Sequence, residues 1–218
     1  MTREELIKKV ALKMDEISSS DDIMIEVGSN DNNPLYEQIN GLLNESINDV
    51  LTKAPIYRLS DHIETLELAG NCSKEETPDK ERQVVVITIP NDFIRIASIS
   101  DANFLRPIVD LAIEGDEIDK KQRNKFLRAK SSKPVGVLCN GGGGRYIVCY
   151  SYSTNVRPMP VVQYISRFDG DLDITSTISM DSYVADIVSW LCAGKVFAAQ
   201  GDINKSKICD ENASALML

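Results

Sequence analysis

The chain has 218 residues, of which 43% are hydrophobic, 26% are charged and 6% are aromatic. This composition is typical of a folded globular protein of one or two domains, and it excludes collagen, a coiled coil and wholesale disorder. The 33 acidic and 24 basic residues give a formal net charge of −9, so the chain lacks the basic character of a typical nucleic-acid-binding domain.

The N-terminal residues predict a helix with a defined start. Thr2 and Glu5 have the spacing of a capping box, in which each side chain accepts a hydrogen bond from the other residue's backbone N–H. Apolar residues at helical spacing continue this helix over 5–17, and a cluster of Ser and Asp ends it. The polar residues 18–33 then predict an exposed loop that holds at most one brief strand.

A second helix is predicted over 34–54. It begins at Asn33-Pro34, because Asn is a favoured N-cap and Pro is tolerated at the first helical position, where its missing N–H would be unpaired anyway. Apolar residues then recur at helical spacing along one face. Pro55 ends the helix, because the residue before a proline avoids helical backbone angles.

The middle of the chain predicts strands. The strongest signal is Val84–Ile89, which is β-branched throughout. Residues 71–83 are charged and contain Pro78, so they predict an exposed loop between strands. Residues 116–130 predict either a short helix or an extended polar loop. Further extended segments are predicted over 63–68, 93–99, 108–113 and 161–168.

A glycine-rich run separates two apolar segments, Pro134–Cys139 and Arg145–Tyr150. A phosphate-binding loop would need Gly-Lys-Ser/Thr and a helix directly after the glycines. Here an arginine and a strand-like segment follow Gly144 instead. The pattern therefore favours a β-hairpin with a glycine turn.

The C-terminal residues predict a helix that is apolar on nearly every side over 183–199. Ser179 is a candidate N-cap, and Gly201 suits the C-terminal cap. Such a helix must be buried on all sides, either by the rest of this chain or by a neighbouring subunit. A last short helix is predicted over 202–213.

The order of helices, then strands, then helices predicts an α+β fold, because a wound α/β sheet would alternate its elements. We expect a helical bundle of two N-terminal and one or two C-terminal helices, made of residues 1–55 and 175–218. Residues 56–174 are expected to form an inserted antiparallel β-rich domain, shaped like a sandwich or barrel.

The cysteines and the N-terminus indicate the compartment. The five cysteines are scattered and include no C-x-x-C pair, so zinc and thioredoxin-type sites are not expected. We expect free thiols in a reducing compartment. The charged N-terminus predicts no signal peptide, and no run approaches the roughly 18 apolar residues of a membrane span.

Residues with catalytic potential are few. His62 is the only histidine, and no cysteine lies in a recognisable nucleophile context. The alternating aspartates of 169–173 could face one cation, but they lack the closing Glu of a calcium loop and favour a turn. We therefore expect no enzymatic activity, no cofactor and no metal. A cysteine-dependent hydrolase that uses His62 is a competing hypothesis.

The densest basic stretch is 120–133, which carries seven Lys and Arg residues. In the simplest interpretation it is a solvated loop or short helix. Alternatively, it contacts phosphates or forms a surface that meets an acidic partner.

Several short motifs resemble head–tail adaptor (connector) proteins of tailed bacteriophages. Ile89–Ile96, with the sequence IPNDFIRI, resembles the L-P-x-D-F-L-R-L segment of that family. Arg106-Pro107-Ile108-Val109 stands where the family has an Arg-Pro-Val step, although the preceding tryptophan is replaced, with Phe104 near its place. Other positions that match in order are Gln122, Asn124, Lys133-Pro134-Val135, Tyr164 and the apolar helix 183–200. The resemblance covers about residues 34–200, and the style of the sequence is similar to crAss-like and other phages of gut Bacteroidales.

The resemblance implies a virion structural protein that forms a ring, commonly of twelve copies, between the portal and the tail. Its partners would be copies of itself, the portal protein, tail or further ring proteins, and passing double-stranded DNA without sequence-specific binding or any membrane. The helices would form a collar at the head–tail interface, assembled in the bacterial cytoplasm. The alternative is a soluble binding module that recognises a peptide or a glycan with its β region.

The apolar C-terminal helix supplies the residues expected at a contact between subunits. Fully burying each large apolar side chain contributes about 1.5–3 kcal/mol, so four or five of them could drive assembly. The candidate interface residues are Tyr183, Ile187, Trp190, Leu191 and Phe197.

Overall fold

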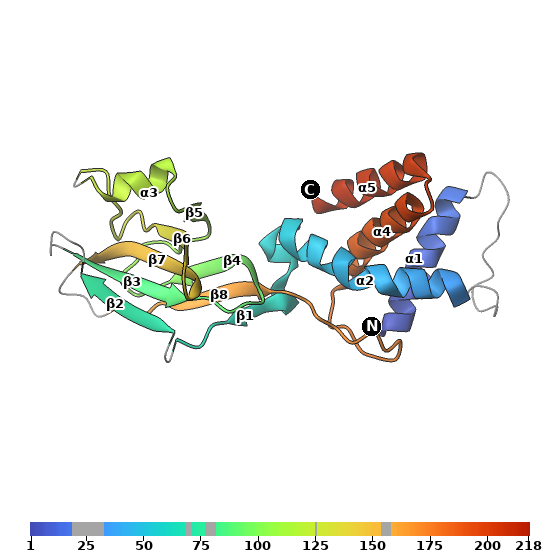
Figure 1. Cartoon of the computed structure of the whole chain (residues 1–218), viewed down its shortest axis with the longest axis horizontal. Helices are drawn as coiled ribbons and strands as arrows, with labels where there is room; N and C mark the ends of the chain where they lie inside the picture. Colours follow the sequence, from blue (N-terminus) through green and yellow to red (C-terminus); the bar gives the residue numbers. More distant parts are fainter. Residues whose placement is uncertain (19–32, 69–70, 77–81, 125, 154–157) are drawn as a thin grey trace. The chain divides into compact units, whose positions relative to one another are not determined.

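A computed structural model describes residues 1–18, 33–68, 71–76, 82–124, 126–153 and 158–218. These residues form five α-helices and two β-sheets, with helices at both ends of the chain, which confirms the mixed α+β class (Figure 1). They group into two compact units. The helical unit contains residues 1–62 and 167–218, and the β unit contains residues 63–166. The predicted domain limits of 1–55 with 175–218 and of 56–174 stay a prediction.

The helical unit is built around α4. Figure 1 shows α4 beside the other three helices of this unit, and it packs against each of them. Of its eighteen residues, eleven are buried. Among the described helices, α4 alone is long and apolar enough to cross a membrane, a criterion that a buried core helix also meets. The four helices are α1 (Arg3–Ser18), α2 (Asn33–Lys53), α4 (Ser182–Ala199) and α5 (Ile203–Met217).

Caps fix the ends of two of these helices as the sequence predicted. The Glu5 N–H donates to Thr2 Oγ1 at 3.2 Å, and the Thr2 N–H donates to Glu5 Oε2 at 2.8 Å, so the capping box is confirmed. Gly201 follows α4 with a φ of +86°, a conformation that glycine adopts at little cost. The Gly201 N–H donates to the Ala198 carbonyl at 3.0 Å, and the Asp202 N–H donates to the Phe197 carbonyl at 2.9 Å. These two bonds form a Schellman motif.

The start of α4 differs from the prediction. Asp181, not Ser179, is the N-cap, and its carboxylate accepts a hydrogen bond from the Tyr183 N–H at 3.4 Å. Asp181 directly precedes the first helical residue, whereas Ser179 lies too early in the chain to reach the same N–H group. The predicted loop over 18–33 lies almost entirely outside the described residues.

The β unit consists of two sheets and one short helix, α3 (Glu117–Gln122). The three-stranded sheet has the order β1-β8-β4, and the five-stranded sheet has the order β2-β3-β7-β6-β5. All strand pairs are antiparallel except β5 and β6, which are parallel. The strands are β1 (Ile63–Thr65), β2 (Cys72–Glu76), β3 (Arg82–Thr88), β4 (Phe93–Ser100), β5 (Leu111–Ile113), β6 (Gly136–Gly141), β7 (Gly144–Ser153) and β8 (Val161–Ser166).

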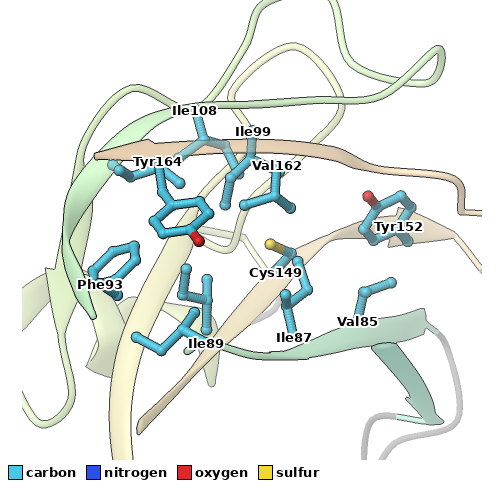
Figure 2. Close-up of a cluster of buried hydrophobic side chains, with 12 residues drawn as sticks. Val85, Ile87, Ile89, Phe93, Ile99, Ile108, Cys149, Tyr152, Val162 and Tyr164 are labelled. Atoms are coloured by element: carbon cyan, nitrogen blue, oxygen red, sulfur yellow. The ribbon is translucent and has the colours of Figure 1, made fainter. Parts of the chain in front are cut away.

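The two sheets share one apolar core, shown in Figure 2. Val85 and Ile87 of β3 point into it, together with Cys149 of the neighbouring β7. Val162 and Tyr164 of β8 enter the same core from the three-stranded sheet. Successive side chains of a strand point to opposite faces, so alternate residues of β3 build this core and the others face the outer side of the sheet.

Two predictions in the β unit have different outcomes. The glycine hairpin is confirmed, because β6 and β7 pair antiparallel up to Gly141 and Gly144. The loop predicted over 71–83 is wrong at 72–76 and 82–83, where β2 pairs with β3, and its residues 77–81 lie outside the described residues. β2 lies at the edge of its sheet, so charged side chains such as Lys74 can face solvent from a regular strand.

Candidate functional site

The five residues predicted for a subunit interface do not form one exposed patch. Ile187, Leu191 and Phe197 are buried within the chain itself. Tyr183 and Trp190 are half-buried, and each lies beside a cation. The Arg58 guanidinium lies 4.3 Å from the Tyr183 ring centroid, and Lys13 Nζ lies 4.8 Å from that of Trp190. Only Tyr183 and Trp190 therefore keep surface for a neighbour, and their role at an interface stays a prediction.

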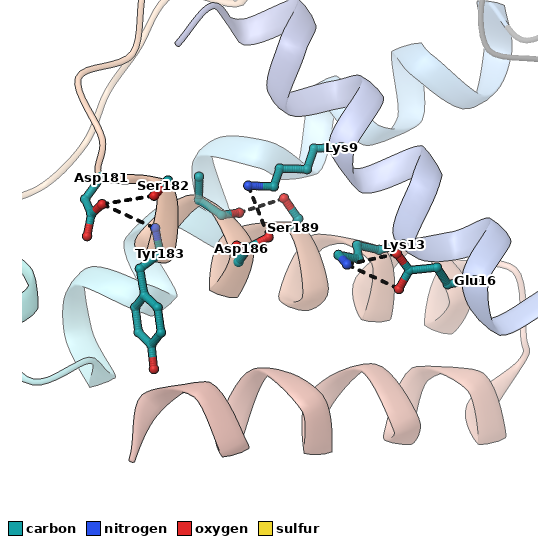
Figure 3. Close-up of polar contacts among 9 residues, drawn as sticks. Lys9, Lys13, Glu16, Asp181, Ser182, Tyr183, Asp186 and Ser189 are labelled. Atoms are coloured by element: carbon teal, nitrogen blue, oxygen red, sulfur yellow. Dashed lines mark hydrogen bonds and ion pairs between the residues drawn. The ribbon is translucent and has the colours of Figure 1, made fainter.

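Charged residues also tie α4 to the N-terminal helices. Lys9 of α1 lies 3.1 Å from Asp186, and Figure 3 shows this pair beside the N-terminal half of α4. Lys195 lies 2.5 Å from Glu45 and 2.8 Å from Asp49, both on α2. These pairs are partly exposed, so each contributes at most about 1 kcal/mol. Together they favour one alignment of the helices.

A ladder of three asparagines on α2 holds the chain segment that leads into α4. Asn40, Asn44 and Asn48 each donate a side-chain hydrogen bond of 2.9 Å to a backbone carbonyl. The acceptors are Leu172, Gly170 and Phe168, respectively. Four residues of helix and two residues of extended chain both advance by about 6–7 Å, so the two periods match. The spacing of four was visible in the sequence, but its partners were not.

Two of these asparagines, Asn40 and Asn44, also bind a buried cation. Arg3 is fully buried. Its Nη1 donates to Asn44 Oδ1 at 2.8 Å, its Nη2 donates to the Asn40 carbonyl at 2.9 Å, and its Nε donates to Asn40 Oδ1. Burial lowers the pKa of Arg3, while the charge of Asp171 acts in the opposite direction. This network links α1, α2 and the segment before α4, and sequence reasoning missed it.

Two rungs of the ladder bind the backbone of a short acidic loop, which we define as residues 169–174. Asp169, Asp171 and Asp173 are exposed and alternate with apolar residues. Leu172 is 56% exposed and Ile174 is 48% exposed. Asp173 Oδ1 accepts hydrogen bonds of 2.9 Å from both the N–H and the hydroxyl of Thr175, which lower its pKa. Among the described residues, no cluster of three or more His, Cys, Asp or Glu side chains could hold a metal ion. The aspartates of this loop therefore act through the hydrogen bonds of its turns.

In the β unit, the last residues of α3 and the segment after it form a second exposed region, which we define as the basic loop, residues 120–133, of which the structure describes all but residue 125. Phe126 is 84% exposed and Leu127 is 59% exposed. The loop carries seven Lys and Arg residues and no acidic residue. Lys120, Lys121, Arg123, Lys130 and Lys133 are exposed.

Hydrogen bonds fix the shape of the basic loop. Gln122 Oε1 accepts from the Ala129 N–H at 2.9 Å, and Asn124 Oδ1 accepts from the Phe126 N–H at 2.9 Å. Ala129 is the buried residue among the described residues of the loop. The Leu105 N–H donates to the Ser131 carbonyl at 3.0 Å, and the Leu105 side chain is 80% exposed. The backbone that carries the exposed apolar side chains is therefore fixed by hydrogen bonds.

An open pocket of about 620 Å³ lies on the outer face of the five-stranded sheet. Its walls combine the valines of β3 with two tyrosines of β7, Tyr146 and Tyr150. Burial raises the pKa of Tyr150 to about 12, so this phenol stays protonated and can donate a hydrogen bond. The full lining is Glu75, Val84, Val86, Thr88, Gly141, Gly142, Gly143, Gly144, Arg145, Tyr146, Val148 and Tyr150.

The thiols lie in environments that disfavour a nucleophile. Burial raises the pKa of Cys139 and Cys192 to about 11, and that of Cys149 and Cys209 to about 12. A reactive cysteine needs the opposite shift, because the thiolate is the nucleophile. Burial also lowers the pKa of His62. These shifts give the hydrolase hypothesis no support.

Several residues of the short sequence motifs lie in the β unit. Phe93 and Tyr164 stack at 5.9 Å between ring centroids, although they lie far apart in the sequence. Arg145 donates to the Phe93 carbonyl at 2.9 Å. Gln122 and Asn124 shape the basic loop, as described above.

No protein-family model matches the chain, and no curated protein matches it.

Proposed function

We propose that this chain is a structural virion protein of a tailed bacteriophage, a head–tail adaptor that forms a ring between the portal and the tail. The proposal rests on the resemblance over about residues 34–200. The observation that carries it is the division of the chain, in which both ends build one helical unit and the middle builds a β unit. In this proposal the helical unit is a bundle that forms the collar, and the β unit is a domain inserted into it.

The distribution of charge supports this role. The helical unit contains 20 acidic and 10 basic residues, a formal net charge of −10. The β unit contains 13 acidic and 14 basic residues, a formal net charge of +1. An acidic collar repels DNA phosphates, so double-stranded DNA would slide through the ring without sticking.

An antibody raised against the purified chain tests the proposal on tailed phage particles from cells that produce it. Gold label is expected at the junction of head and tail on one vertex, as seen by electron microscopy. Image averaging of that vertex would give the number of copies, for which we expect twelve. Label on the tail fibres, on the capsid shell or only in the particle-free fraction would overturn the proposal.

The open pocket favours a second candidate function, a binding module for a peptide or a glycan. Its apolar floor and two phenol groups can stack against a sugar or an apolar side chain and donate hydrogen bonds. A glycan and peptide array probed with the purified chain tests this function. Binding should fall when Tyr146→Ser and Tyr150→Ser are combined, and it should persist in Tyr57→Ser, an exposed tyrosine of the helical unit.

A further inference from the structure

We propose that the basic loop of one copy docks on the acidic loop of a second copy. The contact would be heterologous, because the two surfaces differ and one lies on each unit of the chain. A heterologous contact between identical copies generates a ring when its rotation closes and a filament when it does not. The inference rests on the proposed function in one respect, since a ring needs a contact of this kind.

The basic loop has the composition of an interface surface. Phe126 and Leu127 of the loop, and Leu105, which is hydrogen-bonded to the loop at Ser131, are all large apolar residues that are more than half exposed. Exposed apolar surface of this kind is typical of a binding site. Exposed cations flank them, including Arg123 and Lys130. An apolar centre with a charged rim is the usual anatomy of a protein–protein contact.

The acidic loop is complementary in both respects. Leu172 and Ile174 offer exposed apolar surface, and the three aspartates around them carry the opposite charge. The asparagine ladder and the Asp173 turn hold this loop, so little conformational freedom is lost when a partner binds. The helical unit around the loop has a formal net charge of −10, which extends the attraction beyond direct contact.

A protein partner fits the basic loop better than nucleic acid does. Contacts to DNA phosphates use cations and backbone N–H groups and give no role to Phe126 and Leu127. The whole chain also carries a net charge of −9, which opposes the approach of DNA. A second copy of this chain supplies both an acidic and an apolar counterpart.

Charge reversal in the full-length chain tests the contact. Arg123→Glu/Lys130→Glu reverses the basic loop, and Asp169→Lys/Asp171→Lys reverses the acidic loop. Sedimentation velocity over a range of protein concentration and salt measures self-association. Each reversed variant should associate about tenfold more weakly or worse, because like charges then face each other. A mixture of the two reversed variants should restore association, since each now complements the other.

Matched variants control for net charge. Lys53→Glu/Lys207→Glu makes the same change of charge as the basic-loop variant at exposed positions outside both loops. Glu37→Lys/Glu211→Lys does the same for the acidic loop. Both should associate like the unmodified chain. A third variant, Phe126→Ser/Leu127→Ser, should weaken association without changing its dependence on salt.

Several outcomes would overturn the inference. The unmodified chain could remain a monomer at every concentration, or the reversed variants could associate normally. The basic-loop variant could lose binding to a double-stranded DNA fragment while self-association persists, which would make the loop a phosphate contact. Rings that form equally well with reversed loops would refute this contact and leave the adaptor proposal standing. If the chain instead formed a filament or dimer that depends on both loops, and its antibody labelled no phage particle, the contact would stand and the adaptor proposal would be refuted.

Discussion

Each of the two units is stabilised internally by a different kind of interaction. The β unit has a shared core made almost entirely of apolar side chains from both sheets, such as Ile87 and Val162. The helical unit also has apolar residues inside, but Arg3 and the asparagine ladder bind its segments together through hydrogen bonds. Apolar contacts are non-directional, whereas hydrogen bonds accept only one alignment. The comparison indicates that segments distant in the sequence are aligned in the helical unit by polar groups.

Replacing the buried arginine is expected to have the largest effect. Arg3→Met keeps most of the side-chain volume but removes three charge-assisted hydrogen bonds and leaves the partly buried side-chain oxygens of Asn40 and Asn44 without their donor, at a cost of about 4 kcal/mol in the free energy of unfolding. Trp190 is the only tryptophan and lies in the helical unit, so its fluorescence during urea unfolding measures the loss there. Lys8→Ala, which removes only a solvent-accessible ion pair on the same helix, should cost less than about 0.5 kcal/mol. A similar cost for both variants would contradict the polar alignment of this unit.

Truncating an apolar side chain in the core of the β unit should destabilise that unit and leave the stability of the helical unit unchanged. Ile87→Ala leaves a cavity in the core of the β unit and should cost about 3 kcal/mol there. Hydrogen exchange of β-unit peptides would report the loss, while Trp190 fluorescence should keep its midpoint. The exposed Val161 supplies the control, because Val161→Ala removes little buried area. Equal shifts in both signals would mean that the units unfold as one, and the comparison would then fail.

Removing one rung of the ladder should have a smaller effect. Asn48→Ala deletes the bonds to both the N–H and the carbonyl of Phe168, at a cost of about 2 kcal/mol in the helical unit. Asn204→Ala, an exposed change on α5, provides the matched control and should leave the urea midpoint nearly unchanged. If the two variants behaved alike, the ladder would contribute nothing to stability.

Acid should weaken the helical unit slightly through His62. Burial lowers the pKa of this histidine in the folded chain, so the unfolded chain binds its proton first as the pH falls. The stabilising contribution is complete above the ordinary pKa of about 6.5 and declines as the pH drops below it. Urea midpoints of the unmodified chain and His62→Gln at about pH 7 and pH 5 measure the difference. An equal slope in both chains would show that His62 does not contribute.

Local signals in the sequence predicted most element limits in the fold. The capping box of Thr2 and Glu5 and the glycine at Gly201 each act through neighbours within a few residues, so spacing alone identifies them. The predicted start of the second helix is within one residue of the start of α2 at Asn33, while the capping role predicted for Asn33 stays a prediction. The strand over 84–89 was clear from its β-branched composition, and the extended segment predicted over 93–99 lies in β4. β2 was missed because an edge strand exposes its side chains and therefore resembles a loop in composition.

The candidate surfaces were harder to predict because their geometry depends on distant contacts. The ladder joins residues that lie 120 to 132 positions apart, and no local pattern marks backbone carbonyls as partners. The burial of Ile187 and Phe197 follows from packing by other helices, which the helix's own apolar periodicity does not specify. The basic loop was recognised by its charge, but its exposed Phe126 was recognised only from the structure.

The rungs of the ladder end on main-chain atoms, which every amino acid possesses. Asp169, Leu172 and Ile174 can therefore mutate while the loop remains fixed in the same place, because Asn40, Asn44 and Asn48 recognise no particular side chain there. Such a segment can change its charge or shape over generations without loss of folding. The chain thus has a position at which partner specificity can evolve independently of the scaffold that displays it.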